Sequence, residues 1–458
     1  IFIMRIILVA FTLMLSTLFI GQNQFVNFSG CIENPNNEEV IIYGPNRYKK
    51  VIKLSEGCFS DNLKIETSGE YMFSDGNEST TLYFEKGYNL NITLDTKEFD
   101  ESIIYKGIGN KPNNFLAKYY LYEEQNVLGY KTKESMTELE YFNYQSDYFK
   151  GLYQLLSDTE LENKKFEDSQ KNRFKYEMLN NVLSKSGNSY FNNLTSKKIN
   201  DYVSSTLNTI DLKDTSLYKS DNYYKNFLNN YYKVGLVANN IQCINSFENE
   251  LTAIQRETII YQIAREISFY SDDNIDSNYK ALTRIVKDDK ELAKYTDIYN
   301  KIKSLVKGSP SPSFSYKSID GDTVSLKDLV GKLVYIDVWA TWCGPCKAQF
   351  PFLIKLEEDY RDKDVAFVSI SIDNPKNEDK WRKMVKDKEL KGIQLLAENA
   401  WSSSFAKDYV IRGIPRFILL DKKGYIISPF APQPATYDDN GSPISNKEIH
   451  DLLDKNLN

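Results

Sequence analysis

The residues best suited to chemistry are two cysteines that enclose a glycine and a proline, Cys343-Gly344-Pro345-Cys346. They follow an apolar, β-prone run at residues 333–339 and precede a segment whose apolar side chains recur with helical spacing. Proline suits a first helical turn, because its missing N–H would have no partner there. The cysteines are therefore expected at a helix N-terminus, where unpaired amides and the helix dipole stabilise a thiolate. Since a thiolate is the nucleophile of disulfide exchange, the pair is predicted to be a redox site.

Two other roles for this cysteine pair are open. It could be half of a zinc site, but zinc needs about four ligands. The chain has one histidine, His450, and its other cysteines, Cys31, Cys58 and Cys243, lie far away in sequence. The pair could also be an inert disulfide, although so short a loop gains little from chain entropy. The redox interpretation is favoured, and no metal site is predicted.

The N-terminus has the pattern of an export signal. Met4-Arg5 supplies a positive charge, residues 6–20 are almost wholly apolar, and the chain becomes polar after Gly21. The apolar run is short for a membrane-spanning helix, which needs about 20 residues. We therefore expect residues 1–22 to be a signal peptide, which places the protein in the periplasm or cell envelope. An uncleaved N-terminal membrane anchor is the alternative.

Export changes the interpretation of the remaining cysteines, because disulfides persist outside the cytosol. Cys31 and Cys58 lie in a β-rich region and are candidates for a structural bridge, although the sequence does not fix their geometry. Cys243 stands alone in a helical region and is interpreted as a small, buried apolar residue.

Composition limits the class of protein. Of the 458 residues, 41% are hydrophobic and 26% charged, which is typical of globular proteins. A chain of this length is expected to form about two to four domains. The net charge of −6 does not suit a nucleic-acid surface, so no nucleic-acid partner is predicted.

The first region, residues 24–108, alternates apolar and polar side chains in the manner of strands. Candidate strands are residues 39–43, 63–67, 70–73 and 90–94. Several short strands with turn residues between them predict a small β-sandwich-like domain.

The second region, residues 111–306, has helical periods. Two stripes stand out, one of Tyr141, Tyr144, Tyr148, Leu152 and Leu155 and one of Ile260, Ile263, Ala264 and Ile267. Such stripes are most often core, so the region is predicted to be a helical scaffold without a cofactor. Residues 307–313, Lys-Gly-Ser-Pro-Ser-Pro-Ser, have the composition of a linker.

The third region, residues 314–458, alternates strands and helices. Strands are expected at residues 314–319, 323–326, 333–339, 365–372, 416–420 and 425–428, and helices after the cysteines, at 380–388 and at 446–457. Turn sequences at residues 320–321 and 421–424 predict hairpins. This order predicts an α/β sheet with helices on both faces, and the predicted fold class is multidomain.

Residues 309–458 resemble the thioredoxin superfamily, specifically its exported TlpA/ResA-like branch. The resemblance rests on Val338-Trp-Ala-Thr-Trp-Cys-Gly-Pro-Cys-Lys347, the strand at 365–372, Gly413-Ile414-Pro415 and the terminal hairpin. It implies a C-terminal thioredoxin fold. The β-rich first region resembles an N-terminal domain found on such proteins in Bacteroidetes, which names no activity.

The resemblance implies roles for individual residues. Cys343, nearer solvent, would attack as the thiolate, and Cys346, one helical turn further in, would resolve the mixed disulfide. Ile414-Pro415 matches the family's cis-proline loop, which packs beside the cysteines and holds the substrate backbone. Trp342 is placed with these two residues in the substrate-binding set. No bound cofactor is expected, because the redox group is the Cys343–Cys346 disulfide.

Asp337 is six residues before Cys343, where cytosolic thioredoxins carry a buried acid and many exported relatives a neutral residue. A carboxyl group buried in an apolar strand has a raised pKa and can exchange protons near neutrality. Asp337 is therefore counted as catalytic, as acceptor of the proton of Cys346, directly or through a water. The alternative is a side chain that points to solvent or pairs with a lysine.

The resemblance implies a thiol-disulfide oxidoreductase that acts on protein thiols and disulfides. Gly344-Pro345 and Asp337 are shared with reducing thioredoxins, whose potential is about −270 mV, so a reductase fed by a membrane electron donor is predicted. Family analogy offers apocytochrome c, and thus cytochrome c biogenesis, or misoxidised envelope proteins as substrates. The alternatives are a disulfide isomerase or oxidase, and a binding or scaffold protein of the cell envelope with ancillary redox activity.

Overall fold

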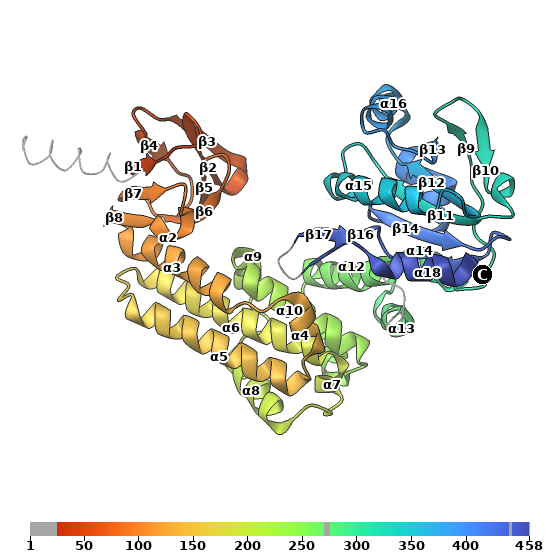
Figure 1. The fold of residues 1–458 in the computed structure, drawn as a ribbon. Helices are drawn as coiled ribbons and strands as arrows, with labels where there is room; N and C mark the ends of the chain where they lie inside the picture. Colours follow the sequence, from red (N-terminus) through yellow and green to blue (C-terminus); the bar gives the residue numbers. More distant parts are fainter. Residues whose placement is uncertain (1–24, 270–274, 439–441, 458) are drawn as a thin grey trace, which may run out of the picture. The chain divides into compact units, whose positions relative to one another are not determined.

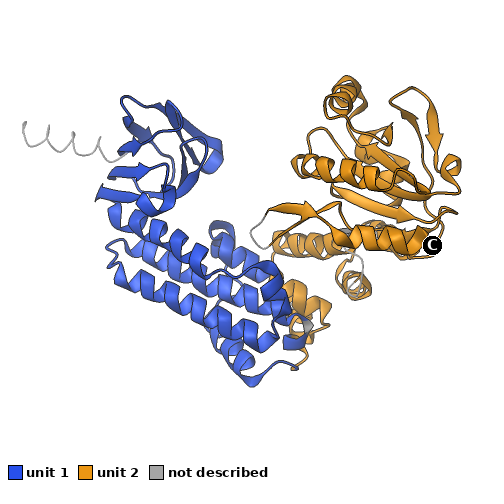
Figure 2. Cartoon of the chain, viewed as in Figure 1, with its two compact units in different colours: residues 1–190, 194–228 blue, residues 191–193, 229–458 orange. Residues whose placement is uncertain are grey.

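The computed structural model describes residues 25–269, 275–438 and 442–457. The chain divides into two compact units, residues 1–190 with 194–228 and residues 191–193 with 229–458 (Figure 2). The predicted signal peptide, residues 1–22, lies outside the described residues. Among the helices that are described, none is both long enough and apolar enough to cross a membrane.

The first unit begins with two four-stranded sheets (Figure 1). Their orders are β4-β1-β7-β8 and β3-β2-β5-β6. The strands are β1 (Phe25–Glu33), β2 (Glu39–Gly44), β3 (Tyr48–Lys53), β4 (Cys58–Lys64), β5 (Gly69–Ser74), β6 (Ser79–Phe84), β7 (Asn89–Asp95) and β8 (Ile104–Ile108), with short helices η1 (Pro45–Arg47) and α2 (Phe99–Ser102). The ring of Phe28 on β1 lies 6.2 Å from Phe73 and 5.2 Å from Phe84 on the other sheet. The β-rich region is confirmed.

The disulfide between Cys31 and Cys58 joins β1 to β4. The two residues are direct partners in the antiparallel ladder, which brings their side chains together. The predicted strand at residues 63–67 is wrong in extent, because β4 ends at Lys64, opposite the start of β1 at Phe25. Ile65 keeps the buried alternation beyond the ladder.

Helices follow in the middle of the chain, as predicted. Those of the first unit are α3 (Asn110–Asn126), α4 (Tyr130–Ser135), α5 (Glu138–Asp158), α6 (Lys164–Ser186), α8 (Lys197–Leu207) and α9 (Thr215–Ser220), whereas α7 (Asn188–Phe191) and α10 (Asn222–Val237) span the division between the units. A capping box of Thr137 and Glu140 starts α5. The Asn163 side chain, which accepts from the amide of Phe166, starts α6.

The predicted tyrosine stripe of α5 is wrong in part. The buried side chains of α5 are Phe142, Gln145, Phe149, Leu152 and Leu156. Tyr141, Tyr144 and Tyr148 are half-buried beside this row and line a pocket. A buried phenol needs a partner for its hydroxyl, so the phenylalanines occupy the dry positions and the tyrosines the wetter ones.

The second unit continues with helices α11 (Ile241–Asn249), α12 (Ala253–Phe269), α13 (Ile275–Ile285) and α14 (Asp289–Ser304). Of the stripe predicted on α12, Ile263, Ala264 and Ile267 are buried, while Ile260 is half-buried. Cys243 is buried and free, as predicted, and burial raises the pKa of its thiol to about 12.

The C-terminal part of this unit is a seven-stranded sheet of order β10-β9-β13-β12-β11-β14-β15 (Figure 1). The strands are β9 (Ser315–Ser318), β10 (Thr323–Ser325), β11 (Leu333–Trp339), β12 (Val365–Ser371), β13 (Ile393–Leu396), β14 (Arg416–Leu420) and β15 (Ile426–Ser428). The remaining elements are η2 (Leu326–Leu329), α15 (Gly344–Asp359), η3 (Pro375–Asn377), α16 (Glu378–Asp387), η4 (Ala400–Ser402), α17 (Ser404–Asp408), the hairpin β16 (Ala435–Tyr437) and β17 (Pro443–Ser445), and α18 (Lys447–Leu457). Strands β11, β12 and β13 are parallel, and β14 is antiparallel to β11.

Helices cover both faces of this sheet, which confirms the predicted α/β layering. On one face, Leu333 and Tyr335 of β11 share a core with side chains of α15 and α18. On the other, Val334 and Ile336 share a core with side chains of α16 and α17. Because the central strand β11 is covered twice, it reads as a continuous apolar run in the sequence.

Residues 307–313, predicted to be a linker, lie along the terminal hairpin instead. The amide of Gly308 donates to the carbonyl of Ile426 at 2.7 Å, and the amide of Ile426 donates to the carbonyl of Ser309 at 2.8 Å. The Ser311 hydroxyl lies 2.7 Å from that of Tyr409. This Ser/Pro-rich segment has a defined position because its backbone groups form hydrogen bonds with strand β15 at the edge of the sheet.

Candidate functional site

The cysteine pair lies where β11 leads into α15. Cys343 and Cys346 are joined by a disulfide, with their Cα atoms 5.3 Å apart. Cys343 is the N-cap of α15, and its Sγ accepts a hydrogen bond from the amide of Cys346 at 3.1 Å. Pro345 stands in the first turn, as predicted. Once the disulfide is reduced, the helix N-terminus stabilises a thiolate at Cys343.

Both cysteines are buried, whereas the residues next to them in the chain are exposed. Cys343 is 4% exposed and Cys346 is 2% exposed, so the predicted difference in their exposure is small. Trp342, Gly344 and Pro345 are exposed. A Cβ atom added to Gly344 would meet no atom of a residue outside its own turn within 4 Å, so the surface beside this residue is open.

A buried aspartate that the sequence analysis missed holds the loop before the cysteines. Asp373, which follows β12, accepts from the amide and the hydroxyl of Thr341, each at 2.8 Å. It also accepts from the hydroxyl of Ser371 at 2.9 Å. These bonds fix the turn between Trp339 and Cys343 and thus the position of the cysteine pair.

The peptide bond between Ile414 and Pro415 is cis, as predicted. The next residue, Arg416, pairs with Val338 in the β11–β14 ladder. Because Val338 is near the end of β11, the cis-proline loop lies beside the strand end that leads to the cysteines. Ile414 packs against the core cluster that contains both cysteines.

Trp401 extends the apolar surface beside the disulfide and was not predicted. Its ring centroid lies 6.2 Å from that of Trp342. The two side chains are 39% and 53% exposed, respectively, which is unusual for residues of this size. In the sequence, Trp401 is a single tryptophan in a polar stretch. Its contact with Trp342 depends on the position of η4, which the sequence does not give.

Asp337 lies inside the sheet rather than at the surface. It is 3% exposed and pairs in register with Ser369 on β12 and Phe417 on β14. Its pKa is raised to about 8, first by burial and then by the carboxylate of Glu357, while a hydrogen bond with Ser369 lowers it. Asp337 therefore does not point to solvent, as the alternative interpretation required. No lysine of the described residues forms an ion pair with Asp337.

Glu357 on α15 is a second carboxyl group with a raised pKa, half-buried, that the sequence analysis missed. Burial raises its pKa to about 7, against the opposing effect of Lys391. Its Oε2 is buried without a hydrogen-bond partner in the described residues. Its Oε1 lies against Gly392, and the side chain lines a surface pocket of about 290 Å³. In the sequence, Glu357 looked like one more charge on a solvated helix face.

Comparison with known proteins identifies the C-terminal part of the chain. A family model described as Redoxin matches residues 306–441. The chain is 31% identical over 122 residues to the thioredoxin-like protein YneN of Bacillus subtilis, a match that covers 27% of this chain and 69% of that protein. The chain belongs to the thioredoxin-like family. It is likewise 27% identical over 133 residues to the thiol-disulfide oxidoreductase ResA of Bacillus cereus, covering 29% of this chain and 74% of ResA.

Solved structures with similarity to the thioredoxin-like domain include two from Bacteroides vulgatus. A crystal structure of a putative thiol-disulfide oxidoreductase is 32% identical, with a TM-score of 0.29, and the match covers 34% of this chain and 99% of that one. A solution structure of a putative thiol-disulfide oxidoreductase is 46% identical, with a TM-score of 0.26, and covers 33% of this chain and 91% of that one.

The thioredoxin-like protein is thus a TlpA/ResA-like thiol-disulfide oxidoreductase, as the sequence motifs implied. The family match begins at residue 306, so it does not account for the β-rich domain or for most of the helices. The resemblance of the β-rich domain to an N-terminal domain of Bacteroidetes proteins stays a prediction.

Proposed function

We propose that this oxidoreductase is a reductase of protein disulfides that works outside the cytosol. The observation that carries the proposal is a Cys-Gly-Pro-Cys disulfide at a helix N-terminus with a buried aspartate, Asp337, in the adjoining strand. Reducing thioredoxins share the Gly-Pro dipeptide and the acid, and their potential is about −270 mV.

In the proposed reaction, the reduced enzyme transfers two electrons to a substrate disulfide. The Cys343 thiolate attacks one substrate sulfur, a mixed disulfide forms, and the other substrate sulfur leaves as a thiolate that takes up a proton. Cys346 then loses its proton and attacks the sulfur of Cys343. The second substrate thiol is released and the Cys343–Cys346 disulfide remains, which is the state of this structure. The two cysteines alone carry the electrons, so no further cofactor is proposed.

Asp337 is proposed to accept the proton of Cys346 in the second step. It lies on the face of β11 that α15 covers, and α15 carries Cys346. With a pKa raised to about 8, its carboxyl group is mixed in protonation near neutral pH and can accept or return a proton. Glu357 then serves as a positioning residue, since its charge raises the pKa of Asp337 from the solvent side.

The substrate-binding surface is proposed to consist of Trp342, Trp401, Ile414 and Pro415. Two exposed indole rings suit apolar side chains next to a substrate cysteine. The cis-proline loop would hold the substrate backbone. Protein thiols and disulfides are therefore the proposed partners, rather than small thiols.

The location and the electron source belong to the same proposal. The disulfide between Cys31 and Cys58 favours an oxidising compartment, where disulfides persist. The apolar run at residues 6–20 favours export by a signal peptide. In such a compartment a reducing pair must be re-reduced, and a membrane electron donor is proposed for this step.

The direct test of the reductase assignment is the reduction of insulin with dithiothreitol as electron source. Turnover well above background is expected, and its absence would sink the proposal. The measured potential of the Cys343–Cys346 pair separates the alternatives: a value near −270 mV supports a reductase, and one between about −120 and −180 mV an oxidase or isomerase.

The roles of the cysteines are tested by substitution. Cys346→Ser should trap covalent adducts with substrate proteins, because the mixed disulfide cannot be resolved. The matched variant Cys343→Ser should trap none. Adducts that form with Cys343→Ser would reverse the assigned roles.

The role of Asp337 is tested by Asp337→Asn. Slower resolution of the mixed disulfide at pH 7 with a normal content of two active-site thiols is expected, by about 100-fold or more for loss of a proton acceptor. Unchanged resolution kinetics would remove Asp337 from the mechanism.

A further inference from the structure

A pocket in the helical part of the first unit carries an inference independent of the redox site. The pocket encloses about 380 Å³ and is lined by side chains of α3, α4, α5, α6 and α10. This volume lies in the range of small-molecule sites, about 300 to 1,000 Å³. All of its lining residues precede residue 229, so they belong to one compact unit, and the Redoxin match does not reach them.

The walls of the pocket are rich in tyrosine. The tyrosines that line it are Tyr119, Tyr141, Tyr144, Tyr148, Tyr176 and Tyr223. Tyr144 is held in place by its hydroxyl, which donates to the carbonyl of Asn126 and accepts from the amide of Leu128, each at 3.2 Å. Fixed rings of this kind present flat apolar faces with a polar rim.

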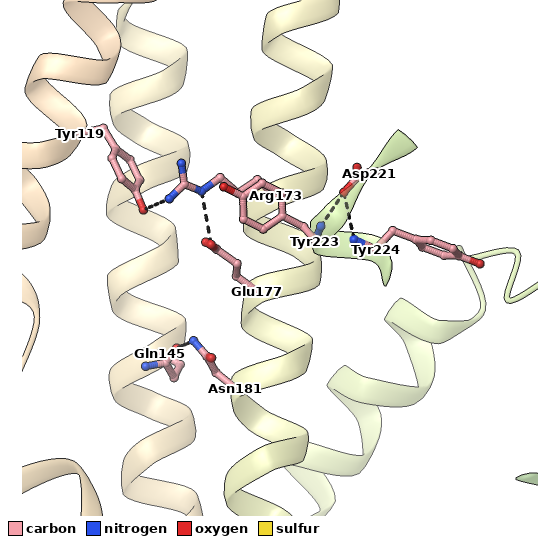
Figure 3. Close-up of polar contacts among 8 residues, drawn as sticks. All are labelled: Tyr119, Gln145, Arg173, Glu177, Asn181, Asp221, Tyr223 and Tyr224. Atoms are coloured by element: carbon pink, nitrogen blue, oxygen red, sulfur yellow. Dashed lines mark hydrogen bonds and ion pairs between the residues drawn. The ribbon is translucent and has the colours of Figure 1, made fainter. Parts of the chain in front are cut away.

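A pair of amide side chains adds hydrogen-bonding groups that the protein leaves unused. Gln145 is 4% exposed, and its Oε1 accepts from Nδ2 of Asn181 at 2.8 Å (Figure 3). Both residues line the pocket. Among the described residues, neither Nε2 of Gln145 nor Oδ1 of Asn181 has another hydrogen-bond partner. One donor and one acceptor therefore stand side by side at the pocket wall, where a ligand can bond to them.

The charges around the pocket cancel. The lining carries two carboxylates, Glu123 and Glu177, and one ammonium group, Lys133. Nε of Arg173 lies 3.3 Å from the carboxylate of Glu177, and Nη2 of Arg173 donates to the hydroxyl of Tyr119 at 2.9 Å (Figure 3). The guanidinium lies 4.5 Å from the ring of Tyr119 and 5.1 Å from that of Tyr223. With two anions and two cations, the site has no excess charge to attract an ion.

These features select one class of ligand. An apolar molecule would leave the amides and carboxylates without water or partners, which is unfavourable. A sugar hydroxyl both donates and accepts, as the Gln145–Asn181 pair requires, and the C–H face of a sugar ring packs on tyrosine. We propose that this pocket binds a neutral saccharide of one or two rings, with Gln145 and Asn181 bonded to its hydroxyl groups and the tyrosine rings against its apolar face.

Calorimetric titration of the full chain with maltose, cellobiose, lactose and N,N′-diacetylchitobiose tests the proposal. At least one sugar should bind with a Kd of about 1 mM or tighter. Gln145→Met keeps the volume of the side chain but removes both polar groups, so it should weaken that binding by about tenfold or more. The matched control is Gln154→Met on the same helix, an exposed residue bonded only to Asp158, which should bind as the parent does.

Unfolding curves establish whether Gln145→Met is folded, and Asn181→Leu replaces it if it is not. The proposal is overturned if none of the four sugars binds at concentrations of tens of millimolar. It is also overturned if both pocket variants bind as tightly as the parent, or if spermidine or oleate binds with Gln145 dependence and the sugars do not. Insulin reduction should be unchanged in all these variants, since the redox site is elsewhere in the chain.

Discussion

At the scale of single residues, two carboxyl groups next to the redox site, the buried Asp337 and the half-buried Glu357, have raised pKa values. Asp337 has a pKa raised to about 8 and Glu357 a pKa raised to about 7, both mainly through burial. Lys391 opposes the shift at Glu357 but does not cancel it, and no lysine of the described residues forms an ion pair with Asp337. The fold thus holds a carboxyl group that is largely protonated at pH 7 inside an apolar sheet.

The first prediction is that Asp337→Asn stabilises the thioredoxin-like domain at pH 8 but much less at pH 5. A carboxyl group with a raised native pKa holds a proton that the unfolded chain releases, so stability falls as pH rises from about 4 to about 8. Each unit of pKa corresponds to about 1.4 kcal/mol, so a gain of a few kcal/mol is expected at pH 8.

Urea unfolding of the oxidised protein, followed by tryptophan fluorescence, measures this gain. All four tryptophans lie between residues 339 and 401, so the signal reports this domain alone. Glu357→Gln should show a smaller gain of the same sign. A gain for Asp337→Asn that is equal at both pH values would contradict the assigned pKa.

The second prediction concerns Trp401, which lies beside Trp342. Trp401→Ala should raise the KM for insulin by about three- to tenfold, since an exposed apolar contact is worth about 1 kcal/mol. The kcat should be nearly unchanged, because Trp401 is proposed to bind the substrate and takes no part in the exchange between the cysteines. Oxidation by a small disulfide, dithionitrobenzoate, is the control and should proceed at the parent rate; a loss there would mean that the redox site itself is disturbed.

At the scale of elements, the disulfide between Cys31 and Cys58 covalently links strands β1 and β4 of the β-rich domain. It joins two neighbouring strands across 27 residues of chain. In the chain-entropy description, closing a loop of this length raises the free energy of the unfolded state by about 3.5 kcal/mol.

The third prediction is that Cys31→Ala combined with Cys58→Ala lowers the free energy of unfolding of the β-rich domain by about 2–4 kcal/mol. Hydrogen exchange at the backbone amides of β1 to β8 follows this domain, and tryptophan fluorescence should give an unchanged midpoint for the thioredoxin-like domain. Equal loss of both transitions would show that the two parts unfold as one.

At the scale of the whole molecule, the second unit extends beyond the family match. Leu305, just after α14, is buried in the core cluster of the sheet. Residues 308–311 add backbone hydrogen bonds along the β14–β15 hairpin. The thioredoxin-like domain is therefore completed by Leu305 and by residues 308–311, which composition marked as part of a linker.

The fourth prediction is that a fragment of residues 314–458 is less stable than one of residues 229–458. Loss of a buried leucine alone costs about 2–5 kcal/mol. Thermal unfolding followed by tryptophan fluorescence measures the difference, and Leu305→Ala in the longer fragment gives the share of that side chain. Equal midpoints for the two fragments would mean that residues 229–313 do not support the domain.

Local signals in the sequence were sufficient for the elements that hold the cysteines. The apolar run at residues 333–339 became β11 with the predicted bounds, and the proline at 345 fell in the first turn of α15. Such features succeed because they depend on residues close in the chain: burial on both faces removes polar residues, and proline fits only certain helical positions. The cis bond before Pro415 followed from the family motif.

What only the tertiary structure decided is which side chains meet. Asp373 reaches Thr341, Trp401 reaches Trp342, and Glu357 raises the pKa of Asp337, although each pair is far apart in sequence. On α5, the fully buried row lies one residue further along the helix than the tyrosine row expected from the sequence, and the tyrosines line the pocket instead. The sequence by itself determined a redox pair at a strand-to-helix junction, because that depends on local order. The second carboxyl group, Glu357, the apolar surface of Trp342 and Trp401, and the tyrosine-lined pocket arise from strand order, register and helix rotation, which are set by packing of the whole chain.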